Sequence, residues 1–224
     1  MKHRRVAVHR SVLVVDVEEF GQEWRTTRHQ LAVREGLYRA LRRAFEDVGL
    51  PWADCRVEDR GDGAFILVPA QVPKGPLVES LPYALADALR QHNKAHPAEA
   101  QIRLRMSLNA GEVAFDDKGV TAPAINRAFR LIEAESAKDA LRESPGVLVV
   151  ITSEWFFDEV VRHSCVLEPA AFRQVPVAVK ETSTTGWLYC PDDPYPVPRG
   201  SGRMSADPLD TTTRDNPVAP ARYP

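Results

Sequence analysis

The feature that most constrains the fold is an unbroken apolar run, Val12 to Val15, which ends directly at Asp16 within the segment SVLVVDVEEFG. Four consecutive apolar residues bounded by polar ones predict a short β-strand with both faces buried. A carboxylate at the end of such a strand is costly to bury without a partner. A divalent cation is one such partner, because it prefers hard carboxylate oxygens. The plainer alternative is that Asp16 marks the point where the strand reaches solvent.

The spacing of apolar residues along the chain predicts an α+β domain. Helical spacing is found over residues 29–48, 77–93 and 124–134, and Pro82 requires the second helix to begin near Ser80 or to kink. Short or alternating apolar runs predict strands over 102–108, 112–115, 147–151, 172–180 and 185–190. Residues 56–68 read as a hairpin turning at Asp62-Gly63, and Gly111 permits a second turn. This order suits one antiparallel-rich sheet with helices packed on one face.

Composition narrows the function classes. A net charge of −2 argues against nucleic-acid binding through bulk charge. The basic arm 1–10 lacks the apolar segment of a signal peptide, and no apolar run approaches the roughly 18 residues that span a membrane. Three scattered cysteines without a C-x-x-C pair predict reduced thiols in a cytoplasmic protein. Residues 191–224 hold eight of the 18 prolines, which predicts a disordered or loosely docked tail after a single domain spanning 11–190.

Two pairs of polar residues are candidates for chemistry. Asp62 lies in the hairpin turn, where Asp-Gly is favoured for backbone reasons alone, but it would meet Asp16 if the two strands are sheet neighbours. Two such carboxylates can hold two Mg²⁺ ions over a phosphate. Asn126 and Arg130 are four apart and share a helix face, either as a solvated face or as groups that orient a sugar oxygen and neutralise a phosphoryl group.

A weaker signal is the pair His92 and His96, which has the spacing of metal ligands on a helix. No third ligand is evident in the sequence, so metal binding there is not expected.

Four segments together resemble a known family. VVDVEEFG, VEDRGDGAFIL, LRMSLNAGEV and INRAFRL are similar, in this order and spacing, to the signatures of class III nucleotidyl cyclases, the adenylyl and guanylyl cyclase catalytic domain. The resemblance runs from about Val12 to Tyr189. It implies a ferredoxin-like palm that works as a head-to-tail homodimer, with each active site shared between protomers. It also implies metal binding by Asp16, Val17 and Asp62 with two Mg²⁺ or Mn²⁺ ions per site, catalysis by Asn126 and Arg130, and phosphate contacts from Glu19, Phe20, Gly21 and Lys180.

The resemblance also bears on the substrate. Glu58 aligns with the family's base-reading position, where an ionised carboxylate only accepts hydrogen bonds. It therefore suits guanine or uracil, which present an N–H, better than adenine. Compact bacterial relatives include pyrimidine cyclases of antiphage defence, which make cyclic UMP or CMP as second messengers.

The chain also departs from the family pattern. It has Glu19, Phe20 and Gly21 where the family often has Gly-Phe-Thr, and it has Ala122 where the family often has Gly. A catalytically silent module that binds nucleotide or a partner and regulates is the alternative to an active cyclase. All four chemical positions are filled here, which favours the enzyme.

Overall fold

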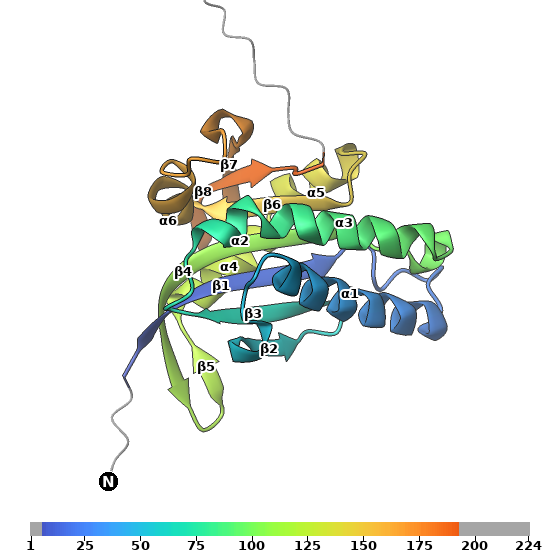
Figure 1. Cartoon of the computed structure of the whole chain (residues 1–224), viewed down its shortest axis with the longest axis horizontal. Helices are drawn as coiled ribbons and strands as arrows, with labels where there is room; N and C mark the ends of the chain where they lie inside the picture. The colour runs from blue at the N-terminus through green and yellow to red at the C-terminus, as the bar shows by residue number, and fades with distance from the viewer. Residues whose placement is uncertain (1–5, 193–224) are drawn as a thin grey trace, which may run out of the picture.

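The computed structural model describes residues 6–192, and Figure 1 shows a twisted sheet with helices packed against it. The sheet has the order β2-β3-β1-β4-β6-β8-β7, and β5 pairs with β4. The strands are β1 (Val8–Val17), β2 (Arg56–Asp59), β3 (Gly63–Pro69), β4 (Leu104–Asp116), β5 (Gly119–Thr121), β6 (Leu148–Ser153), β7 (Arg173–Val179) and β8 (Thr182–Tyr189). Neighbouring strands are antiparallel except for the parallel pair β4 and β6. The predicted α+β class with an antiparallel-rich sheet is confirmed.

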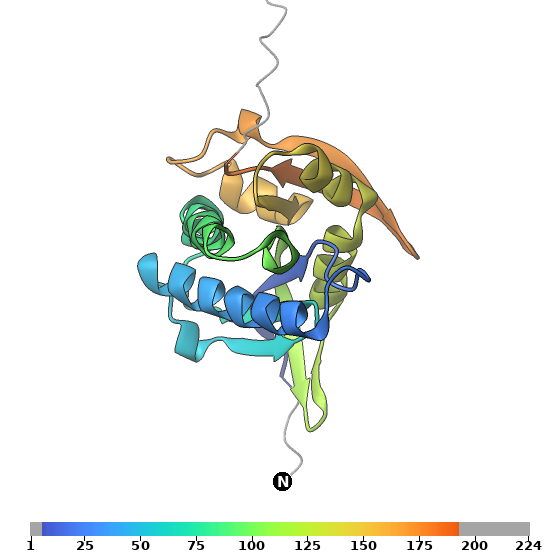
Figure 2. The ribbon, with the colours of Figure 1, turned by 90° about the vertical axis from the view of Figure 1, so that its right-hand side faces the viewer.

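The helices lie on both faces of the sheet (Figure 2). They are α1 (Thr27–Asp47), α2 (Gly75–Glu79), α3 (Leu81–Lys94), α4 (Pro123–Glu133), α5 (Glu135–Glu143) and α6 (Glu154–Phe156), with a π-helical turn over Phe157–Val161 and short 3₁₀ turns over Trp52–Asp54, Ala98–Ala100 and Pro169–Ala171. Leu13 and Val15 of β1 face the cluster under α1 and α3, whereas Val12 and Val14 face α4. The apolar run is thus buried on both faces, as predicted. The expectation of helices on one face holds for α1, α2, α3 and α6, whereas α4 and α5 pack on the other face.

The register of the three central strands fixes the position of Asp16. It lies opposite Gly63 of β3 and opposite Arg105 of β4. A side chain at Gly63 would overlap the backbone carbonyl of Val15, so this position requires glycine. The β2–β3 hairpin therefore approaches β1 closely at Asp16, one residue before the strand ends at Val17.

Two predicted turns are placed differently. The hairpin turns over residues 60–62, with Gly61 at φ +84° and the Arg60 amide bonded to the Gly63 carbonyl at 3.0 Å, so the left-handed glycine is Gly61. β4 runs straight through Gly111, where an added Cβ would lie 2.8 Å from the Ala124 Cβ of α4. Gly111 thus allows helix packing rather than a turn.

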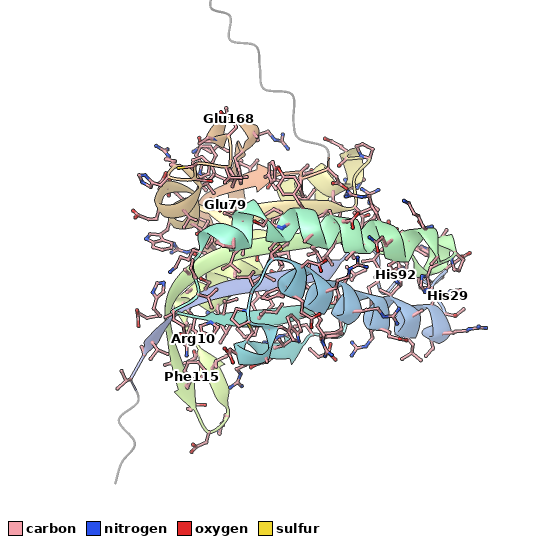
Figure 3. The ribbon with its side chains drawn as sticks, viewed as in Figure 1. Arg10, His29, Glu79, His92, Phe115 and Glu168 are labelled. Atoms are coloured by element: carbon pink, nitrogen blue, oxygen red, sulfur yellow. The ribbon has the colours of Figure 1, made fainter. Side chains whose placement is uncertain are left out.

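The real turn follows Asp116, whose carboxylate accepts bonds from the Lys118 and Gly119 amides at 2.8 and 3.0 Å. The β4–β5 hairpin projects from the body as an arm, and at its base the Arg10 guanidinium lies 5.7 Å from the centre of the Phe115 ring (Figures 1 and 3).

Other boundaries agree with the sequence or add to it. Helix α2 ends at Glu79 and Pro82 lies in the first turn of α3, so the proline separates two helices rather than kinking one. Ser153 caps the next helix by accepting the Phe156 amide at 3.1 Å. Helix α5 was not expected from the pattern. None of Cys55, Cys165 and Cys190 forms a disulfide bond.

The described part of the chain ends on an anchored residue. The carboxylate of Asp192 pairs with Arg90 of α3 at 3.1 Å and accepts the Val147 amide at 3.0 Å. The rest of the predicted tail, 193–224, and residues 1–5 of the predicted basic arm lie outside the described residues. Within 6–192, no helix is long and apolar enough to cross a bilayer.

Candidate active site

A pocket of about 230 Å³ opens between the end of β1, the β2–β3 turn, Arg105 of β4 and the helices α4 and α5. Asp16 and Asp62 both line it, so the predicted meeting of the two carboxylates is observed. Register brings them there, because the Val17 amide donates to the Asp62 carbonyl at 2.9 Å and ties the hairpin turn to the end of β1. The Val17 side chain points into the core on the other face, so only its backbone can contribute to the pocket.

The Asp16 carboxylate is held against Arg105 by an ion pair across β1 and β4. The two side chains are 24% and 14% exposed, so solvent screens this pair less than a surface one. Burial raises the pKa of Asp16, Arg105 opposes that shift, and the nearby charge of Asp62 adds to it. The Arg105 Nε–H is buried and has no hydrogen-bond partner in the structure. The carboxylate of Glu133 on α4 also lines the pocket. The pocket thus combines the mutually repelling carboxylates of Asp16 and Asp62, a third carboxylate and an incompletely satisfied guanidinium.

Three cations line this pocket that sequence reasoning did not assign to it: Arg60, Arg105 and Lys138. Arg105 alternates with apolar residues on β4. This alternation predicts that its side chain lies on the polar face of the strand, but it does not predict that Asp16 lies opposite. Lys138 lies on α5, for which no sequence signal was found. Its charge also acts on the Asp16 carboxyl, favouring the ionised form and lowering the pKa.

Asn126 and Arg130 share one face of α4, as predicted, but neither lines the Asp16 pocket. Asn126 is exposed. Arg130 is 16% exposed and pairs with Glu133 at 3.2 Å and with Glu181 of the β7–β8 turn at 3.3 Å. Its Nε–H is buried without a partner. The apolar face of α4 packs on β1 and β3, so these two residues face away from that core.

Glu58 lies on the edge strand β2 and is held by two arginines. Its carboxylate pairs with Arg56 at 2.7 Å and with Arg60 at 3.2 Å. The Arg60 guanidinium in turn lies over the Phe65 and Phe129 rings, 5.5 and 5.2 Å from their centres. This cluster therefore presents both hydrogen-bond acceptors and donors at one place, rather than the carboxylate alone.

The predicted phosphate contacts fall in two places. Glu19, Phe20 and Gly21 form a turn directly after β1, in which Glu19 adopts a left-handed conformation with φ 55°. Lys180 lies in the β7–β8 turn, also left-handed at φ 51°, beside the Glu181 that pairs with Arg130. Lys180 does not line the Asp16 pocket. The structure therefore places it with the α4 residues and not with the aspartates.

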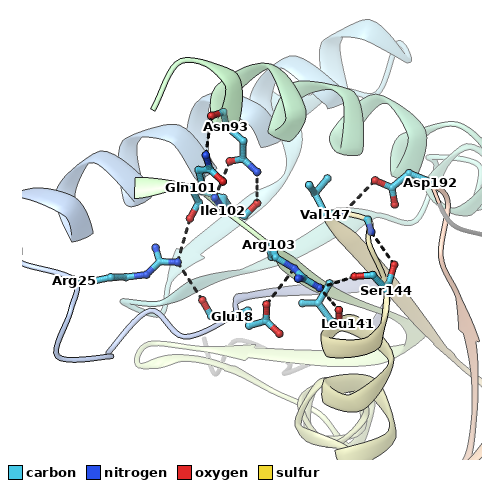
Figure 4. A network of polar contacts seen from close by, with 11 residues as sticks. Glu18, Arg25, Asn93, Gln101, Ile102, Arg103, Leu141, Ser144, Val147 and Asp192 are labelled. Carbon is cyan, nitrogen blue, oxygen red and sulfur yellow. Dashed lines mark hydrogen bonds and ion pairs between the residues drawn. The ribbon is translucent and has the colours of Figure 1, made fainter. Parts of the chain in front are cut away.

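A polar network fixes the turn that follows Asp16 (Figure 4). Glu18 pairs with Arg103 at 3.2 Å, and Arg103 also donates to the Leu141 and Ser144 carbonyls. The buried Arg25 donates to the Gln101 carbonyl at 3.1 Å and to the Glu18 carbonyl at 3.5 Å. The Glu18 carboxylate is thereby paired rather than free to repel an anion.

Side chains of the described residues alone do not complete a metal site. Residues 6–192 contain no cluster of three or more His, Cys, Asp or Glu side chains that could hold a metal ion. Two carboxylates are nevertheless the usual protein share of a Mg²⁺ site whose other ligands are water and substrate phosphates. The donor set around Asp16 and Asp62 fits an ion of that kind.

Comparison with known proteins relates this geometry to solved structures. No protein-family model matches the chain, and no curated protein matches it. The "adenylate/guanylate cyclase/hydrolase" from Silicibacter pomeroyi is 16% identical with TM-score 0.57, covering 84% of this chain and 100% of that one. The guanylyl cyclase Cya2 is 14% identical with TM-score 0.58, covering 88% and 97%. The guanylate cyclase domain of RhGC from Catenaria anguillulae, solved in complex with GTP, is 15% identical with TM-score 0.52, covering 81% and 96%. The chain therefore has the fold of the class III nucleotidyl cyclase catalytic domain, which confirms the fold that its four motifs predict.

Proposed function

We propose that the chain is a nucleotidyl cyclase, which converts a nucleoside triphosphate into a 3′,5′-cyclic nucleotide and pyrophosphate. The observation that carries this proposal is the meeting of Asp16 and Asp62 in one pocket that also holds Arg60, Arg105 and Lys138. A metal-bound triphosphate needs carboxylates that hold the metal ions and positively charged side chains that contact the phosphates. The shared fold supports the same assignment.

In this reaction the 3′-hydroxyl oxygen attacks the α-phosphorus and gives up its proton to water, and the bond between that phosphorus and the α,β-bridging oxygen breaks to release pyrophosphate. Asp16, Asp62 and the Val17 backbone would hold Mg²⁺ or Mn²⁺, which when bound would lower the pKa of the hydroxyl and neutralise charge on the phosphates. Arg105 is placed to bind a phosphate oxygen through its unpartnered Nε–H, and Lys138 adds a second positive charge. Positioning and charge neutralisation then supply most of the catalysis.

We further propose that the working unit is a head-to-tail homodimer. Asn126 and Arg130 lie outside the pocket that holds the aspartates, so a single chain does not bring the four groups together. A two-fold partner that presents its α4 to this pocket would complete two equivalent sites. Asn126 would then orient the ribose, and Arg130 would neutralise charge that grows on the phosphoryl group. Lys180, close to Arg130 in the fold, would approach the phosphates from the same side.

For the base, we propose GTP or a pyrimidine triphosphate such as UTP in preference to ATP. Glu58 accepts from an N–H, and its partners Arg56 and Arg60 donate to a neighbouring carbonyl oxygen. Guanine and uracil each present an N–H beside a C=O, whereas adenine presents an acceptor nitrogen beside an amino group. A cytoplasmic location and a second-messenger role in antiphage defence, as in the pyrimidine cyclases, stay predictions.

One experiment separates the active enzyme from a catalytically silent module. The full-length chain is incubated with each of the four ribonucleotides and Mn²⁺, and cyclic products are detected by mass spectrometry. We expect a cyclic nucleotide, formed fastest from GTP or UTP. The Asp16–Arg105 ion pair is the observation that favours a silent module, because it occupies a metal-binding oxygen. Nucleotide binding without any cyclic product, with or without a partner protein, would establish that alternative.

A further inference from the structure

A second hollow lies on the opposite face of the sheet from the Asp16 pocket, between α1 and α3. It has a volume of about 210 Å³, and small residues line it: Gly36, Ala40, Ala88 and Ala95. Gly36 must stay small, because a side chain there would overlap the imidazole of His92, which Figure 3 labels on α3. We call this hollow the α1–α3 slot. It has no part in the proposed reaction.

The remaining lining of the slot carries basic and polar side chains. These are Arg39 and Arg43 from α1, and Gln91, His92 and His96 from α3. No carboxylate is among the lining residues. Arg39 does pair with Glu35, and Arg43 with Asp47 at 3.4 Å, but the two arginine side chains are 66% and 51% exposed. Pairs this exposed contribute little and are readily exchanged for another anion.

The two histidines are arranged so that each keeps one ring nitrogen free. His92 donates its Nε2–H to the Ala100 carbonyl at 3.0 Å, and His96 donates its Nδ1–H to the His92 carbonyl at 2.8 Å. The rings stack with centroids 3.8 Å apart. Protonation would turn the free nitrogens into donors, but two stacked imidazolium rings repel each other. An anion beside them would relieve that repulsion.

We propose that the α1–α3 slot binds a small phosphate-class oxyanion, such as inorganic phosphate, pyrophosphate or a phosphate monoester. The arginines supply charge-assisted and bidentate contacts that match phosphate oxygens. His92 adds a donor when it is protonated. The charged groups around it are Glu35, Arg39, Arg43 and Asp47 on α1, and Asp87 and His96 on α3. Burial, together with the neighbouring His96, lowers the pKa of His92, so an anion that favours the charged ring should raise that pKa.

The slot is joined by hydrogen bonds to the turn that follows Asp16. The Gln101 side chain donates to the His96 and Asn93 carbonyls, each at 3.3 Å, and the Gln101 carbonyl accepts from Arg25. Arg25 in turn reaches the Glu18 carbonyl (Figure 4). A ligand that orders His96 therefore acts on the same network that holds this turn, which makes the slot a place for an effector rather than a substrate.

The test titrates inorganic phosphate into the full-length, nucleotide-free protein in a chloride-free buffer at roughly pH 6, where imidazoles titrate. Ring-proton resonances of the histidines are followed by NMR, and the affinity is measured by calorimetry. We expect saturable shifts confined to His92 and His96, and an upward shift of the His92 pKa in the presence of phosphate. Pyrophosphate should give the same pattern.

Two variants and one matched control decide the assignment. Arg43→Gln and Arg39→Gln should each weaken phosphate binding at least about tenfold, since each removes a charge-assisted contact. Arg42→Gln makes the same change of charge on the same helix but does not line the slot, and it should leave the affinity within about twofold. The absence of a saturable shift, or an equal loss in Arg42→Gln, would overturn the proposal. Because no nucleotide is present, either result is independent of the proposed cyclase activity.

Discussion

Mixing two inactive variants should restore activity if the active site is shared between protomers. Asp16→Asn removes a carboxylate from the pocket but keeps its shape, and Arg130→Ala removes the guanidinium from α4. Each variant alone spoils both sites of its homodimer. In a mixed dimer, one site combines intact aspartates from the Arg130→Ala chain with an intact arginine from the Asp16→Asn chain. The opposite site lacks both groups.

The size of the recovery follows from the symmetry. With equal amounts and free exchange, about half of the dimers are mixed, and each has one of its two sites whole, so activity should return to roughly a quarter of wild type. Folding should survive, because the carboxylate partners of Arg130 are 43% and 75% exposed and such pairs contribute only about 0–1 kcal/mol.

The assay measures cyclic product from the mixture, while mass spectrometry of intact dimers verifies exchange. Arg127→Ala, on the same helix and outside the proposed site, is the matched control and should stay active. If mixed dimers form and the product stays at the level of either variant alone, Arg130 does not act across the interface.

Four further changes test other parts of the structure. Asp62→Asn should lower turnover at least about 100-fold with an unchanged melting temperature, because it removes a cation ligand rather than core packing; retained turnover would remove Asp62 from the site. Glu58→Lys should change the ranking of the four nucleotides by about tenfold or more, and an unchanged ranking would mean that Glu58 does not read the base. Burial raises the pKa of Asp16 above its ordinary 3.8, so this group favours the folded chain most below that pH and less as the pH rises. Asp16→Asn should therefore be more stable than wild type in urea near neutral pH, with the difference shrinking toward pH 3.8. Truncation after Asp192 should leave the melting temperature unchanged, whereas truncation after Cys190 should lower it, because it removes the partner of Arg90 and of the Val147 amide.

The sequence was most informative where local pattern and tertiary packing agree. The run Val12 to Val15 predicted a strand buried on both faces because every residue in it is apolar, and the structure places helices on both sides. The expectation of helices on one face was wrong for α4, since the order of elements does not say on which side of the sheet a crossover helix returns. Gly111 was misplaced for a related reason. A glycine demanded by a close helix and a glycine demanded by a turn look the same in one sequence.

The candidate site was predictable only in part. Asp16 and Asp62 could be paired because both lie at strand ends next to a turn. No sequence pattern indicated that Arg60, Arg105 and Lys138 lie in the same pocket as the two aspartates. Arg105 comes from a strand whose register with β1 no local pattern reveals, and Lys138 comes from a helix whose apolar residues are mostly alanines. The two arginines on Glu58 were missed because contacts between residues i and i+2 depend on the local strand and turn geometry.

Because Asp16 is paired with Arg105, a metal ion and a nucleotide are expected to strengthen each other's binding to the proposed site. A divalent cation and this arginine compete for the same carboxylate, so the cation alone must displace a paired guanidinium. A triphosphate alone would approach a pocket lined by three carboxylates. In the proposed cyclase, the cation would bind Asp16 while the released Arg105 would bind a phosphate oxygen, so each ligand would remove the obstacle to the other. By linkage, the apparent affinity for the metal should rise with nucleotide concentration, and the apparent affinity for nucleotide should rise equally with metal.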